Sequence, residues 1–134
     1  MNSLRTMRST KAKGTGPEIR LRVALYSAGL RGYRLNLRGL PGRPDIAFPR
    51  HKLAVFVHGC FWHRCPTCNP RPPKSNARFW RKKFAENVMR DTLARRLLDN
   101  LGWSVIELWE CEIEESAAGC AERVVRWLAA AKDQ

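Results

Sequence analysis

The chain has 134 residues, 44% of them hydrophobic, and its 25 lysines and arginines against 12 acidic residues give a formal charge of +13. This length allows one domain, and this apolar content excludes a wholly disordered chain. The sequence has no apolar run of about 18 residues and no apolar secretory signal after Met1, so we expect an intracellular protein that does not span a membrane. Five cysteines in such a compartment favour a metal site or catalysis over disulfide bonds.

Basic charge is concentrated in the first three quarters of the chain. Residues 1–102 carry 22 of the 25 basic side chains but only 5 of the 12 acidic ones, whereas residues 103–134 are net acidic. Each basic group beside a phosphate releases condensed counterions, so this distribution favours a nucleic-acid ligand. A solvated basic face or contact with an anionic membrane is the alternative.

The predicted elements begin after a basic, flexible arm at residues 1–14, and residues 15–134 are predicted to form a single domain. Thr15 and Glu18 match a capping box, which predicts a helix that ends at Gly29. The predicted buried face of this helix consists of Ile19, Val23, Tyr26 and Leu30.

Three short strands are predicted next. Residues 33–37 alternate between apolar and polar, as in a half-buried strand. A turn at residues 40–44 precedes two strands, at residues 45–48 and 53–57, which a turn at residues 49–52 connects. The strand at residues 53–57 is apolar throughout, which is typical of a central strand.

The second half of the chain starts with a loop at residues 59–74 that is rich in Cys, Pro and His. A long helix is predicted from a Ser75 cap to Leu101, stopped by Gly102, followed by a strand at residues 103–109 and a last helix. The apolar residues of that last helix are Val124, Val125, Trp127 and Leu128. The order helix, three strands, helix, strand, helix predicts an α/β/α sandwich around a short mixed sheet.

Cysteine spacing is the sharpest local signal. Three thiols lie within nine residues: Cys60, Cys65 and Cys68. The last two form a C-x2-C pair, which a tight loop can direct at one zinc ion. The tetrahedral site needs a fourth ligand, either Cys111 after the predicted strand or His63. Cys120 is predicted to be a buried apolar residue. Ordinary reduced cysteines are the alternative, but zinc would brace an irregular loop in so small a domain.

Four residues are candidates for metal binding or proton transfer. Asp45 opens a strand after a Pro-Gly-Arg-Pro turn, where its carboxylate suits Mg²⁺, with an Asx-turn cap as the alternative. His58 and His63 lie close in sequence, which favours proton transfer as much as a hydrogen-bonded core role. Asp91 falls on the inward face of the long helix and needs a histidine or arginine partner. That pair would orient a catalytic imidazole or form a structural salt bridge.

Aromatic residues occur beside basic ones. Phe61 and Trp62 stand in the polar cysteine loop, where large aromatic side chains can stack on bases or wedge between them. Phe79 and Trp80 are adjacent on the long helix and cannot both point outward, so core packing of one of them is the alternative to stacking on bases. The basic residues that follow are Arg81, Lys82 and Lys83.

Four segments of the chain carry a resemblance to a known family. They are Leu40-Pro41-Gly42-Arg43-Pro44-Asp45; Val55-Phe56-Val57-His58-Gly59-Cys60-Phe61-Trp62-His63; Phe79-Trp80 with Asn87-Val88-Met89-Arg90-Asp91; and Gly102-Trp103 with Trp109-Glu110-Cys111. Together with Met7-Arg8-Ser9 and Pro17-Glu18, and in this order, they make the chain similar to the very short patch repair (Vsr) DNA mismatch endonucleases.

This resemblance implies a restriction-endonuclease-like fold and a Mg²⁺-dependent nick beside a T:G mismatch left by deaminated 5-methylcytosine. The implied Mg²⁺ ligands are the Asp45 carboxylate and the Val57 backbone carbonyl. The implied catalytic residues are His63 as general base, Asp91 to hold it, His58 at the phosphate and Glu18 on the active-site helix. The implied intercalating residues are Phe61, Trp62 and Trp80.

The chain departs from nuclease patterns in two ways. No Glu-x-Lys follows the central strand, so the histidines replace the usual nuclease lysine. Cysteine stands at position 65 where some relatives have histidine, which implies an all-thiolate zinc site. Its ligands would be Cys60, Cys65, Cys68 and Cys111.

The expected partner is duplex DNA with a T:G mismatch, bound by a monomer in the bacterial cytoplasm, at the nucleoid. Other mismatch-repair proteins are further expected partners. The chain ends soon after its last helix, which is expected to leave little surface for binding them. Two other functions fit the sequence: a defence or restriction nuclease on the same scaffold, and a zinc-containing DNA-binding module without catalysis.

Overall fold

A computed structural model describes residues 16–132 of the chain. The basic arm expected at residues 1–14 and the Thr15 cap lie outside the described residues. The elements, in order, are α1 (Gly16–Ser27), β1 (Arg34–Leu35), β2 (Ile46–Phe48), the 3₁₀ turn η2 (Pro49–His51), β3 (Leu53–His58), α2 (Cys60–His63), α3 (Ala77–Asn100), β4 (Ser104–Trp109), α4 (Glu110–Glu115) and α5 (Ala117–Lys132).

The four strands form one mixed sheet in the order β1-β2-β3-β4. β1 pairs with β2, and β2 with β3, in antiparallel orientation, whereas β3 and β4 are parallel. A parallel pair needs a long crossover, which α3 supplies. The register places His58 opposite Trp109 at the carboxyl ends of β3 and β4, so residues that follow the two strands meet at one edge of the sheet.

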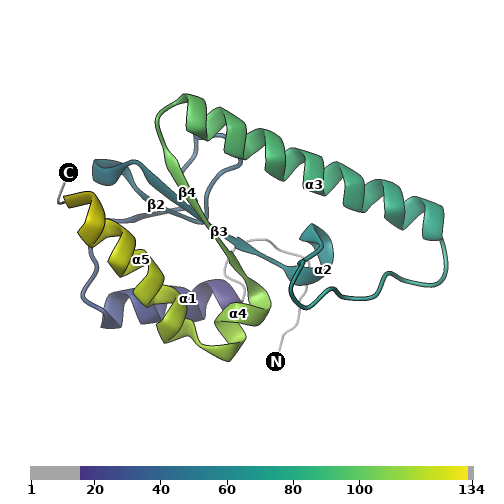
Figure 1. Cartoon of the computed structure of the whole chain (residues 1–134), viewed down its shortest axis with the longest axis horizontal. Helices are drawn as coiled ribbons and strands as arrows, with labels where there is room; N and C mark the ends of the chain where they lie inside the picture. Colours follow the sequence, from purple (N-terminus) through teal and green to yellow (C-terminus); the bar gives the residue numbers. More distant parts are fainter. Residues whose placement is uncertain (1–15, 133–134) are drawn as a thin grey trace.

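Helices cover both faces of the sheet, with α3 on one side and α1, α4 and α5 on the other (Figure 1). Leu53 and Val55 of β3 pack in the core under α1, α4 and α5, and Ala54 and Phe56 pack toward Leu98 of α3. Burial of alternate residues on opposite faces explains why β3 is apolar throughout. The predicted mixed α/β layering is therefore confirmed.

The predicted buried face of the first helix is wrong for three of its four residues, and only Leu30 of that set packs against the core. Ile19, Val23 and Tyr26 are 41%, 61% and 58% exposed, and the buried residues of α1 are Glu18, Leu21 and Leu25. The buried stripe has helical spacing but contains an acid. Sequence periodicity favoured the purely apolar stripe, because carboxylates are seldom buried without a function or a partner.

Two element boundaries also differ clearly from the prediction, and two short helices are additional. α3 starts at Ala77, so its N-cap residue is Asn76 and not the predicted Ser75. Asn76 has a left-handed backbone (φ 56°), and its side chain makes no capping hydrogen bond. The strand expected at residues 33–37 shrinks to Arg34–Leu35. The loop at residues 59–74 contains the single turn α2, and α4 is an additional helix. Within residues 16–132, no helix combines the length and hydropathy needed to cross a membrane.

Candidate active site

A cavity of about 1080 Å³ opens at the carboxyl ends of β3 and β4. Side chains from the segment before β2, from β3, α2, α3 and β4 line it, so elements far apart in the sequence converge there. The titratable groups of the predicted site that line it are Asp45, His58, His63 and Asp91. Glu18 lies on the buried face of the adjacent helix α1.

Asp45 is held by the neighbouring strand. Its Oδ2 accepts a hydrogen bond of 2.7 Å from the backbone N–H of Val57. Burial raises the pKa of Asp45 to about 6, the negative charge of Glu18 adds to this rise, and the Val57 hydrogen bond and the charge of His58 oppose it. A buried carboxylate whose pKa is raised by burial and by a second negative charge favours a bound cation.

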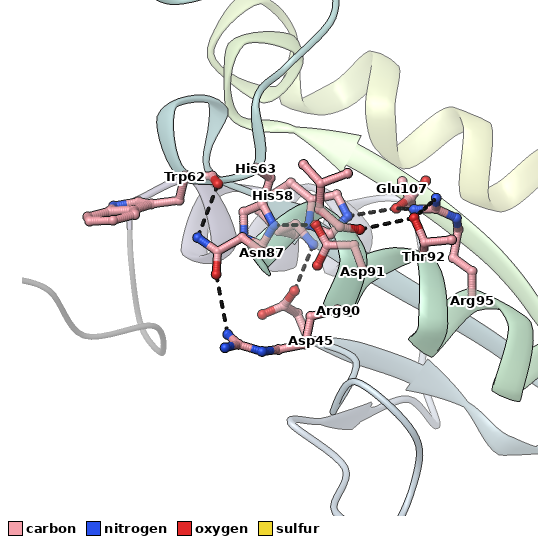
Figure 2. A network of polar contacts seen from close by, with 12 residues as sticks. Asp45, His58, Trp62, His63, Asn87, Arg90, Asp91, Thr92, Arg95 and Glu107 are labelled. Atoms are coloured by element: carbon pink, nitrogen blue, oxygen red, sulfur yellow. Dashed lines mark hydrogen bonds and ion pairs between the residues drawn. The ribbon is translucent and has the colours of Figure 1, made fainter. Parts of the chain in front are cut away.

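His63 and Asp91 form a short pair. Nδ1 of His63 lies 2.6 Å from Oδ2 of Asp91, across the space between α2 and α3 (Figure 2). Asp91 therefore has the histidine partner that its inward position predicts. A carboxylate accepts only, so Nδ1 of His63 carries a proton and Nε2 is the nitrogen left to act on a ligand.

His58 has a partner that the sequence reasoning missed. This buried ring places Nε2 2.8 Å from Oε2 of Glu107 on β4, and the same oxygen accepts a 2.7 Å hydrogen bond from Arg95 on α3 (Figure 2). The His58 bond is the main cause of a lowered pKa at Glu107. An available signal was a charged residue inside the otherwise apolar strand β4.

The two histidine rings are neighbours, with centroids 4.4 Å apart. His58, His63 and Asp91 place potential ligand atoms within 4.8 Å of one another. The two histidine–carboxylate pairs thus form one compact acid–base group beside Asp45.

A second cluster includes the first residue of α2 and cysteines of the loop that follows it. The Sγ atoms of Cys60, Cys65, Cys68 and Cys111 all lie within 4.8 Å of one another. The Cys65–Cys111 separation is 3.8 Å, and bonds from zinc to sulfur of about 2.3 Å give a tetrahedral edge of about 3.8 Å. Cys111, not His63, therefore completes the group, and Cys120 is buried separately in the core.

The thiols differ in how readily they ionise. Burial raises the pKa of Cys60 and of Cys111 to about 11. Burial opposes ionisation of Cys65 as well, but hydrogen bonds from the backbone of Cys68 and Thr67, together with those from the thiols of Cys111 and Cys68, lower its pKa to about 7. Four thiolates this close need a cation to offset their repulsion, so the donor set fits a metal.

Aromatic side chains gather at the cavity rim. Phe61 contacts Trp62, Trp80 and Phe84, with centroids 5.1–5.7 Å apart. Trp62 is 48% exposed, and its carbonyl oxygen accepts a hydrogen bond from Asn87. Phe84 is buried, so the cluster is anchored in α3 while Trp62 remains accessible.

Arg64 ties this aromatic cluster to its loop. Its guanidinium lies 4.2 Å from the centroid of the Phe84 ring and donates to the carbonyl oxygens of Phe61 and Pro70. Of the predicted basic run, Lys83 lines the cavity, whereas Arg81 and Lys82 are exposed outside the lining. Arg43 and Arg90, which the sequence reasoning did not select, also line the cavity.

Comparisons with known proteins bear on this site. The family described as "DNA mismatch endonuclease Vsr" matches residues 2–69. The type II nicking enzyme V.NmeAIP of Neisseria meningitidis is 39% identical over 122 residues, which cover 91% of this chain and 86% of that protein. The type II nicking enzyme V.NaeI of Lentzea aerocolonigenes is 43% identical over 113 residues, which cover 81% and 67%. The DNA mismatch endonuclease Vsr of Escherichia coli K12 is 33% identical over 128 residues, which cover 92% and 81%.

Proposed function

We propose that this chain, which belongs to the family of Vsr DNA mismatch endonucleases and is a DNA endonuclease, nicks one strand of duplex DNA beside a T:G mismatch. Residues 15–134 act as a single endonuclease domain with a restriction-endonuclease-like fold, and the protein acts as a monomer. The observation that carries the proposal is the convergence of Asp45 and two histidine–carboxylate pairs in one cavity with an aromatic rim.

The Asp45 carboxylate and the Val57 backbone carbonyl are the proposed Mg²⁺ ligands. The buried, raised-pKa carboxylate of Asp45 beside Glu18 fits a cation, because a positive charge would offset both burial and repulsion. When bound, Mg²⁺ polarises the phosphate and lowers the pKa of a bound water.

His63 is the proposed general base. Its Nδ1 is paired with Asp91, so Nε2 takes the proton from the attacking water. Asp91 then stabilises the positively charged ring, as a carboxylate does beside a catalytic imidazole. His58, which lies against His63, assists at the phosphate.

Phe61, Trp62 and Trp80 are proposed to enter the base stack next to the mismatch. Opening a base step costs least where pairing is already defective, so stacking gains more at a T:G pair than at a normal pair. Lys83, at the cavity, is proposed to hold a backbone phosphate, with Arg81 and Lys82 beside it.

The four-thiol cluster is proposed to hold a structural zinc. The tetrahedral edge between Cys65 and Cys111 supports this, as does the lowered pKa of Cys65. The site has four protein ligands and no open position, so its contribution is to fix α2 and the loop that follows it.

A nicking assay tests the proposal directly. Purified protein is incubated with T:G and matched duplexes of the same sequence, with Mg²⁺ or with Ca²⁺ in its place, and strand breaks and binding are both measured. We expect Mg²⁺-dependent nicking of the T:G duplex only. Equal cleavage of matched duplex would instead favour a restriction-type nuclease, and binding without cleavage would favour a non-catalytic DNA-binding module.

A further inference from the structure

We propose that Glu107, itself held by Arg95, is a positioning residue that fixes the ring of His58 for the nicking reaction. This inference rests on the proposed function, because His58 has a role only if the chain cleaves DNA. Its basis is the chain of contacts from α3 through Glu107 to His58, at the wall of the cavity (Figure 2).

The hydrogen bond between His58 and Glu107 sets the tautomer of the ring. A carboxylate has no proton to donate, so Nε2 of neutral His58 must carry the hydrogen. The two ring nitrogens point to different sides of an imidazole. Nδ1 is therefore the basic nitrogen, and it is turned away from Glu107.

Arg95 restricts Glu107 in turn. Its guanidinium donates a hydrogen bond of 2.7 Å to Oε2 of Glu107 and one of 3.2 Å to Oγ1 of Thr92. The Thr92 hydroxyl in turn donates a hydrogen bond to the carbonyl oxygen of Val88, one turn earlier. The carboxylate is thus fastened to α3 as well as to the histidine. Ring packing completes the arrangement, because His58 lies between Phe56 and Trp109, with centroids 5.8 and 5.0 Å away.

A purely structural salt bridge between α3 and β4 would explain the contact between Arg95 and Glu107. It would not explain why His58 binds the same carboxylate oxygen. Oε2 of Glu107 accepts from both Arg95 and the buried histidine, so any movement of the carboxylate changes His58 directly. Arg95 also lines the cavity and is partly exposed, so contact with a DNA phosphate is the competing role.

The test combines kinetics with a spectroscopic signature. Glu107→Leu removes the acceptor, Glu107→Gln keeps an acceptor oxygen, and Arg95→Leu frees the carboxylate. Arg96→Leu is the matched control, since it removes the same charge from the next position on α3. Long-range ¹H–¹⁵N spectra of the His58 ring report its tautomer without DNA, and thermal unfolding reports whether each variant folds.

We expect Glu107→Leu to replace the single Nε2–H tautomer by the mixture of both neutral forms that an unpartnered imidazole adopts, and to lower kcat about 10- to 100-fold with KM for DNA unchanged. Glu107→Gln should keep the single tautomer and recover most of kcat, and Arg95→Leu should cause a smaller fall in kcat. Arg96→Leu should change neither quantity.

Two results would overturn the inference while the proposed function stands: a Glu107→Leu protein whose His58 ring stays in the single tautomer of wild type, or one that shows the mixture of tautomers and nicks at the wild-type kcat. A rise in KM alone for Arg95→Leu would assign Arg95 to DNA contact and remove it from the positioning role. Failure of the wild-type protein to nick any duplex would instead overturn the proposed function.

Discussion

The thiol cluster and the cavity cluster, which share the single turn α2, differ in how fully their polar groups surround one point. The thiol cluster is closed: four cysteines face one point, and a cation there would satisfy all of them. The cavity cluster is open: Asp45 is buried with a raised pKa, and its neighbours leave a space of about 1080 Å³. Closed groups of ligands stabilise a fold, whereas open groups of charges are kept for chemistry.

Breaking the closed cluster should have the largest effect. We expect Cys111→Ser to lose the zinc that wild-type protein binds at about one equivalent, and to unfold at a much lower temperature, because a structural zinc contributes directly to folding. Metal analysis and thermal unfolding measure both effects. Cys120→Ser is the control, since Cys120 is buried elsewhere in the core, and equal zinc content in the two variants would contradict the assigned ligands.

Breaking the open cluster should remove activity and spare the fold. Asp45→Ala is expected to lower nicking at least about 100-fold while affinity for DNA stays nearly unchanged, because the carboxylate is a proposed metal ligand and not a phosphate contact. Nicking rates and binding to the same T:G duplex test this. Asp99→Ala, an exposed change on α3, serves as the control, and normal nicking by the Asp45 variant would rule out its role.

Changes in the aromatic and basic side chains near the cavity should separate recognition of the mismatch from general electrostatic attraction to DNA. Trp62→Ala should reduce the preference for T:G over matched duplex by about 1–3 kcal/mol, the value of one base–aromatic stack. A triple change to alanine at Arg81, Lys82 and Lys83 should weaken binding to both duplexes alike and flatten its salt dependence. Affinities for both duplexes at two salt concentrations distinguish them. An equal loss on both duplexes for Trp62→Ala would make that residue ordinary surface.

The smallest expected effect is a gain in stability. The pKa of Asp45 is raised from 3.8 to about 6 in the folded state, so the stability it contributes is present below pH 3.8 and is lost as the pH rises through 6. Asp45→Asn, which does not titrate, should therefore be more stable than wild type above pH 6, by about 1–3 kcal/mol without Mg²⁺. Denaturant unfolding across this pH range should show the difference shrinking in acid. A constant difference would place its cause elsewhere.

The sequence predicts the sheet and the thiol cluster well because both depend on short-range pattern. The apolar run of β3 and the C-x2-C spacing are local features, and the parallel register of β3 and β4 brings Cys111 to the others. A charge on an inward helical face indicated a histidine or arginine partner for Asp91, and the family resemblance implied that this partner is His63. In each case one physical cost, burial or ligand number, leaves few solutions.

The remaining features depend on contacts between distant segments. Glu107 is a charge inside an apolar strand, but its partner Arg95 has unremarkable neighbours in sequence, and their link to His58 arises only when β4 and α3 pack together. The buried face of α1 was missed for a related reason, because Glu18 is buried and its charge acts on Asp45, and the periodicity of apolar residues cannot indicate a buried acid. Functional sites are where local preferences yield to tertiary demands.

The single turn α2 has a consequence for how a newly made chain matures in the cell. Cys60 is its first residue and His63 its last, with Phe61 and Trp62 between them. On the proposed assignments, a chain that has not acquired its metal lacks an ordered turn, and it loses the general base and the mismatch wedge at the same moment. Zinc shortage would then produce an inactive protein and not a nuclease of relaxed specificity, so non-specific breaks in genomic DNA would be avoided.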